Sequence, residues 1–107
     1  MTSGLGHFEK LVLLAVAQLA DAYGVAIRRE IEDKTGRQVS AGAIYTSLER
    51  LEARGLVRSE LTDPTPVRGG RRKRVYRLRP PGERALESSL EELRRMAHGM
   101  EARFRLS

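Results

Sequence analysis

The apolar residues of this 107-residue chain change their spacing twice, and these changes constrain its fold more than any other feature. Up to Gly55 they recur at intervals of three and four residues, the spacing of one face of a helix. From Leu56 they alternate with polar residues, as in a half-buried strand. Helical spacing returns after Pro80-Pro81. This pair can open the last helix, because proline is tolerated in the first turn. One domain of helices and a hairpin is therefore expected, since a chain of this length rarely forms two.

Three helices are predicted in the first half of the chain. The first covers Leu5–Leu19 and is mostly buried, because its apolar residues form a wide stripe. The second, Tyr23–Thr35, is short and amphipathic, and Gly36 ends it. The third covers Ser40–Gly55, and the Ser40 hydroxyl can cap it by accepting a hydrogen bond from an unpaired amide of the first turn.

The second half predicts a hairpin and a last helix. Strands are expected in Leu56–Thr62 and Val75–Leu78, with Tyr76 and Leu78 on one face, and proline and glycine between the strands favour a long tip. A helix from Pro81 to Phe104 would be about 36 Å long. The whole order predicts a mainly α fold with a small β-hairpin. It is a winged helix-turn-helix in residues 1–79 with a long C-terminal helix in residues 80–107, which packs with the first helix and is not an independent domain.

The apolar residues of the last helix alternate at four and three positions, a coiled-coil-like seam that needs a partner helix. It either pairs with another chain or folds back on its own first helix, and both hold if these helices interleave between two protomers. We predict a homodimer with the following contact residues: Phe8, Leu11, Leu86, Leu90, Leu93, Ala97, Met100 and Phe104.

Seven basic residues and no acidic one lie between Arg68 and Arg79. The segments before, within and after this cluster carry −1, +7 and 0, which together give the net charge of +6. A charge concentrated in about a dozen residues indicates a local electrostatic site, although a run of like charges is often only a solvated surface. Its place directly after a helix-turn-helix favours contact with DNA.

The outward face of the third helix is small at its start and nearly neutral. Small residues allow DNA to approach closely, and hydroxyls can donate to phosphates or contact base edges. One alternative is that Gly42 and Ala43 only pack against the second helix. Another is that Tyr45 is a half-buried core residue whose hydroxyl reaches solvent.

Three segments resemble the PadR family of bacterial winged-helix transcriptional regulators, in its short type with a single C-terminal dimerisation helix. They are SAGAIYTSLERLEARGLV from Ser40, YGVAI from Tyr23 and RRKRVYRLRPPGERAL from Arg71, and the likeness spans Phe8 to Leu90. Two departures are Ala41, where the family often has proline, and Arg79, where it often has a threonine cap.

The resemblance implies a homodimer whose third helices enter adjacent major grooves of double-stranded DNA and whose wings contact the flanking backbone or minor groove. Half-sites of a palindromic operator should then lie about 34 Å apart. If about four cations per protomer touch phosphate, log affinity should fall against log salt with a slope near −7. The predicted DNA-binding residues are Ser40, Ala41, Gly42, Tyr45, Thr46, Glu49 and Arg50 in the third helix, and Arg68, Arg71, Arg72, Lys73 and Arg74 in the wing.

Enzymatic, metal and cofactor functions find little support. The chain has no cysteine, its histidines His7 and His98 lie far apart in sequence, and no nucleophile stands beside a base. Neither a cofactor nor a metal site is predicted. The longest apolar run, Leu11–Ala17, is too short to span a bilayer and does not resemble a signal peptide, which fits a cytoplasmic protein.

A DNA-binding repressor is therefore the favoured function, because a dimer on a promoter blocks polymerase and this chain is short for an added activation domain. Three alternatives stay open. The fold could be a protein-interaction module, or an RNA binder, which the 5% aromatic content disfavours. It could also sense a metal or an effector at the dimer interface, although the lack of tryptophan argues against sandwiching an aromatic ligand.

Overall fold

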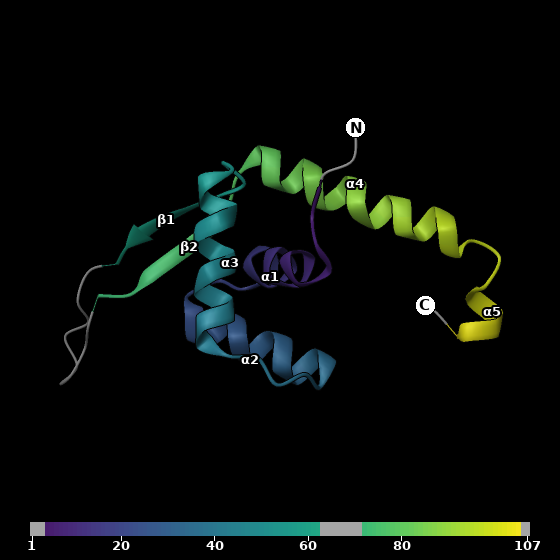
Figure 1. Ribbon diagram of the computed structural model, residues 1–107, viewed down its shortest axis with the longest axis horizontal. Coiled ribbons are helices and arrows are strands. Elements are labelled where there is room, and N and C mark those ends of the chain that lie inside the picture. Colours follow the sequence, from purple (N-terminus) through teal and green to yellow (C-terminus); the bar gives the residue numbers. More distant parts are fainter. Residues whose placement is uncertain (1–3, 63–71, 106–107) are drawn as a thin grey trace.

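The computed structural model describes residues 4–62 and 72–105. Its helices and strands follow the predicted order: α1 His7–Gln18, α2 Gly24–Thr35, α3 Ala41–Ala53, β1 Val57–Leu61, β2 Arg74–Leu78, α4 Pro80–Ala97 and α5 Glu101–Phe104. Helices α1 to α3 pack together beside the hairpin, and α4 extends away from them toward α5 (Figure 1). The predicted mainly α fold with a small hairpin is confirmed.

The end of α2 and both ends of α3 lie where the sequence places them, for the expected reasons. Ser40 Oγ accepts a hydrogen bond from the Ala43 amide at 3.1 Å and caps α3. Gly36 follows α2 with φ 72°, and Gly55 follows α3 with φ 76°. Both angles lie in the left-handed region, which glycine enters without a Cβ clash. Arg79 precedes α4 without a side-chain cap, as expected from its departure from the family pattern.

The hairpin is antiparallel, with Ser59 opposite Tyr76 and Val57 opposite Leu78. The connection between α1 and α2 runs along its other edge, where the Tyr76 amide donates to the Ala22 carbonyl at 2.8 Å and Tyr23 forms a bridge with Val75. Successive residues Val75 and Tyr76 are both buried, although they point to opposite faces of β2. The sequence pattern predicted that Tyr76 and Leu78 share one face of the strand. It did not predict that Val75, on the other face, would be buried.

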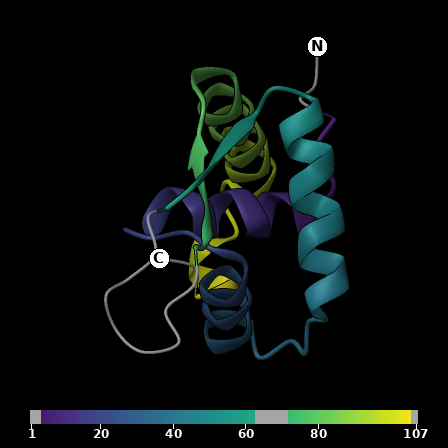
Figure 2. The same ribbon diagram turned by 90° about the vertical axis from the view of Figure 1, so that its left-hand side faces the viewer.

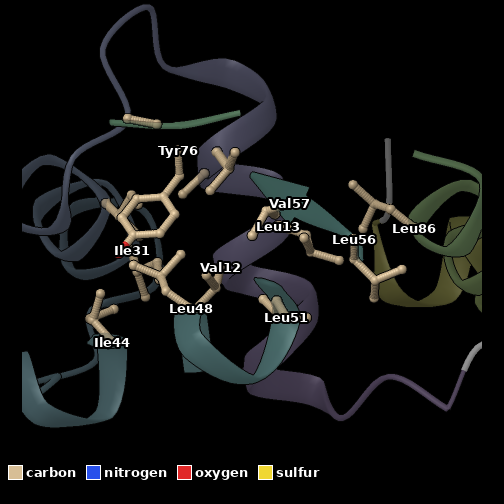
Figure 3. Packing of buried hydrophobic residues seen from close by; sticks show 14 of the residues in the cluster. Val12, Leu13, Ile31, Ile44, Leu48, Leu51, Leu56, Val57, Tyr76 and Leu86 are labelled. Carbon is tan, nitrogen blue, oxygen red and sulfur yellow. The ribbon is translucent and has the colours of Figure 1, made fainter. Parts of the chain in front are cut away.

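The core lies between α1, α2, α3 and the hairpin, and Figure 2 shows α1 crossing behind α3 and the strands. Val12 and Leu13 of α1 are fully buried, as are Leu48 and Leu51 of α3, and Figure 3 shows Val12, Leu48 and Leu51 around the same space. Replacing a leucine in such a core by alanine typically costs about 2–5 kcal/mol. This packing fixes which face of α3 points to solvent.

The last helix is shorter than predicted. It does not run to Phe104, because α4 ends at Ala97 and the separate helix α5 follows the turn at Gly99, whose φ is 93°. With 18 residues, α4 is about 27 Å long instead of about 36 Å. Met100 and Phe104 therefore do not continue the α4 seam. Figure 1 shows that α5 lies out of line with α4.

The start of α4 lies against the end of the α3–β1 turn. A Cβ atom on Gly82 would overlap the Leu56 carbonyl oxygen and stand 2.9 Å from its carbon. Both atoms belong to the backbone, so this approach requires glycine. Leu86, one turn later, is buried in the core and anchors α4 to its own chain.

Candidate nucleic-acid interface

The N-terminal half of α3 presents a small and open surface. Ser40, Ala41, Gly42 and Thr46 are exposed, and a Cβ atom built on Gly42 would meet no atom within 4 Å outside its own helix and chain neighbours. Gly42 therefore does not pack against α2, and that alternative is wrong for this residue. The free space lets another molecule approach the helix backbone.

The C-terminal half of this face carries one charge of each sign. Glu49 and Arg50 are both exposed, so the face stays nearly neutral. The guanidinium of Arg50 lies 4.0 Å from the carboxylate of Glu9, a residue of α1. Glu9 is buried, accepts a hydrogen bond from the Gly6 amide at 2.9 Å and lies 3.7 Å from Arg54. It ties the start of α1 to the end of α3.

Sequence reasoning did not identify Glu9, although a signal was present. It is the acidic residue inside the apolar stripe of the first helix, where a charge without a partner would cost several kcal/mol. The arginines that pair with it lie more than 40 positions away in the chain. Their proximity arises only from the packing of α1 against α3.

Three of the five predicted wing cations belong to the described part of the chain. Arg72, Lys73 and Arg74 are all exposed, whereas Arg68 and Arg71 lie outside the described residues. The Lys73 ammonium stands 4.2 Å from the centre of the Tyr23 ring, within the range of a cation–π contact. Arg74 donates to Ser59 Oγ at 3.0 Å, and Ser59 Oγ donates to Glu52 at 2.8 Å.

Two further cations of the basic cluster serve the fold of the chain itself. Arg77 Nε lies 3.1 Å from Glu60 Oε1 across the hairpin, and Arg79 donates to the Gly55 carbonyl at 3.3 Å. Within the described residues, the exposed cations Arg72, Lys73 and Arg74 therefore remain as candidates for contact with phosphate.

The turn between α2 and α3 is held by Glu32. Its carboxylate accepts a hydrogen bond from the Val39 amide at 2.9 Å and lies 3.5 Å from Arg28. The hydrogen bond from Val39, helped by the charge of Arg28, holds the pKa of Glu32 below its ordinary value. This contact sets the path of the chain that leads into α3.

The residues predicted to form a dimer contact fall into two groups. Leu86 is buried in its own core, and Phe8 and Leu11 pack partly against that core. Leu90, Leu93 and Phe104 are exposed, and Ala97 and Met100 are half-buried. Met96, which the predicted seam omitted, is 82% exposed beside them. A run of large apolar side chains on a projecting helix is typical of a contact surface.

Other site classes are not seen in the described residues. No group of three or more histidine, cysteine, aspartate or glutamate side chains there could hold a metal ion. His98 lies at the end of α4, 3.7 Å from Glu101, and His7 begins α1. Among these residues no helix is both long and apolar enough to cross a membrane.

Comparison with known proteins gives a consistent assignment. The profile of the Transcriptional regulator PadR-like family matches residues 12–88. Transcriptional regulator Rv3488 of Mycobacterium tuberculosis is 39% identical over 93 residues, which are 84% of this chain and 82% of that protein.

Solved structures agree with this likeness. A PadR family transcription regulator from Clostridium difficile R20291 gives a TM-score of 0.75 at 26% identity, over 92% of this chain and 99% of that one. The complex structure of hsRosR-S4 gives 0.69 at 28% identity, over 90% and 76% of the two chains. The predicted resemblance is confirmed, and the chain belongs to the PadR-like family of transcriptional regulators, which are winged-helix DNA-binding proteins.

Proposed function

We propose that the protein is a homodimeric repressor that binds a palindromic operator through α3 and the wing. One observation carries this proposal. The open face of α3, from Ser40 to Arg50, is exposed on the same molecule as the cations of the wing base, Arg72 and Lys73. A helix of this kind fits the major groove, and arginine suits phosphate because its planar fork can bond two oxygens.

The two parts of the surface have different tasks in this proposal. Contacts to phosphate fix position and affinity but carry no sequence information, whereas contacts to base edges do. The wing cations supply the first kind of contact. The nearly neutral face of α3 supplies the second, and Glu49 and Arg50 are its charged members.

Dimerisation is proposed through α4. Residues 1–79 form the DNA-binding part, and residues 80–107 the dimer contact, anchored to the core at Leu86. Leu93, 52% exposed, and Met96 leave apolar surface uncovered on α4 within the described chain. A second copy related by a twofold axis would cover this surface and place two α3 helices toward one DNA molecule.

Repression follows from occupancy. A dimer that covers a promoter excludes polymerase, and it needs no contact with polymerase to do so. In vitro transcription from a promoter carrying the operator should fall as the protein is added. A rise in transcript would contradict repression while leaving DNA binding intact.

The proposal is tested by a gel shift with a variant in which the wing cations Arg68, Arg71, Arg72, Lys73 and Arg74 are alanine. Loss of duplex binding is expected, with an unchanged dimer in sedimentation. Unchanged duplex binding would reject the assignment of the wing. Single-stranded RNA in the same assay tests the RNA alternative, and a partner that binds the wing variant normally would favour a protein-interaction module.

A further inference from the structure

Gly24, the first residue of α2, lies beneath the side chain of Tyr45 from α3. It is buried, and a Cβ atom there would overlap the Tyr45 hydroxyl oxygen, stand 2.5 Å from Cζ and 2.8 Å from Cε1. All three atoms form the far end of a side chain that can swing away. A larger residue at position 24 would therefore displace the tyrosine ring, and the backbone could stay in place.

The backbone conformation of Gly24 does not require glycine. Its φ does not lie in the left-handed region, unlike those of Gly36 and Gly55. Alanine is also the better helix former, and at a compatible position it stabilises by reducing the freedom of the unfolded chain. The absence of a side chain at Gly24 is explained by the space that Tyr45 occupies.

The Tyr45 ring, which lies over Gly24, extends from α3, and its hydroxyl points toward the wing. Tyr45 is 44% exposed, so one part of the ring is covered by α2 and another faces solvent. Its hydroxyl reaches the start of α2, and the preceding residue, Tyr23, forms the bridge with Val75 of β2 and lies under the Lys73 ammonium. This hydroxyl therefore lies between the exposed face of α3 and the base of the wing.

We propose that Gly24 is a positioning residue that seats Tyr45 so that its hydroxyl donates to a backbone phosphate between the groove that α3 enters and the wing. Phosphate is the group that a duplex presents along its backbone, and tyrosine hydroxyls commonly donate to it. This inference rests on the proposed DNA binding. It assigns a role to Gly24, which makes no contact with DNA itself.

The hydroxyl is tested first, with Tyr45→Phe. This variant keeps the ring over Gly24, so its melting temperature should not fall. Its dissociation constant for operator duplex should rise by about tenfold per protomer, the scale of one hydrogen bond to a charged group. The slope of log affinity against log salt should stay unchanged, because a neutral hydroxyl releases no counterion. Binding equal to that of the wild type would overturn the proposal.

The positioning role is tested with Gly24→Ala, alone and combined with Tyr45→Ala. In the wild-type background Gly24→Ala should weaken binding as much as Tyr45→Phe does. In the Tyr45→Ala background it should have no further effect on binding and should raise the melting temperature, because the clash is gone. An equal loss of affinity in both backgrounds would show that Gly24 acts independently of Tyr45 and would overturn its role.

The two proposals fail in different ways. If the wild-type protein binds no duplex, the proposed function fails, and the phosphate contact fails with it. If the wild type binds and Tyr45→Phe binds equally well, only the present inference fails. Duplex selected from random sequence serves as the probe in every arm.

Discussion

Arg72 provides a quantitative test of the wing, because its charge can be removed alone. Arg72 is exposed and forms no ion pair with another described residue. A protein cation that binds a phosphate releases counterions from the DNA. Each such contact contributes about −0.9 to the slope of log affinity against log salt. In a dimer, Arg72→Ala removes two contacts. The slope should therefore change by about 1.8, from near −7 to near −5.

Arg77→Ala is the matched control. It removes the same charge from the same segment, but Arg77 lies 3.1 Å from Glu60 and is already paired. The slope for this variant should differ from the wild-type slope by less than about 0.45, half of what one phosphate contact contributes. Fluorescence anisotropy of a labelled duplex between about 50 and 200 mM salt, over which a protein with about 6–10 phosphate contacts loses about 10³–10⁵ in affinity, measures all three proteins. Equal changes in both variants would refute the reasoning, because they would report net charge and not phosphate contacts.

Three further predictions concern the dimer and the fold. Leu93→Glu should weaken the dimer by about a hundredfold or more in analytical ultracentrifugation, since the two leucines that the proposed dimer covers are replaced by charges; an unchanged dimer would place the contact elsewhere. Gly82→Ala should lower the free energy of unfolding by about 1–3 kcal/mol in urea, because its methyl group would overlap the Leu56 carbonyl; wild-type stability would show that α4 can shift. Glu32→Gln should destabilise the fold at pH 7, and this difference should shrink as the pH falls. The pKa of Glu32 is lower in the folded chain than the ordinary 4.5, so its carboxylate stabilises the fold above that pH, and this contribution is lost as the pH falls through the folded value. A difference that does not depend on pH would mean that the Val39 contact needs no charge.

The helices could be predicted because their signals are local. Ser40 and Gly36 mark helix ends by chemistry that acts within one turn, and both act as expected. The end of α4 could not be predicted in the same way. Glycine costs a helix only about 1 kcal/mol relative to alanine, so Gly99 did not decide from sequence alone whether the helix continues.

The candidate site was predictable in its location and less so in its details. The exposed face of α3 follows from the periodicity of Ile44, Leu48 and Leu51. The partners of Arg77 and the neighbours of Lys73 come from segments distant in sequence, which no local pattern connects. The role of Glu9 and the contact between Tyr45 and Gly24 also join segments distant in sequence, so the sequence did not predict them.

The central claim, a twofold dimer that reads DNA with α3, is tested most directly by selecting bound duplexes from random DNA with the purified protein. A palindromic site is predicted, with half-sites separated by about one helical turn, roughly 34 Å. An enriched site without twofold symmetry, or no enrichment above random duplex, would contradict the account.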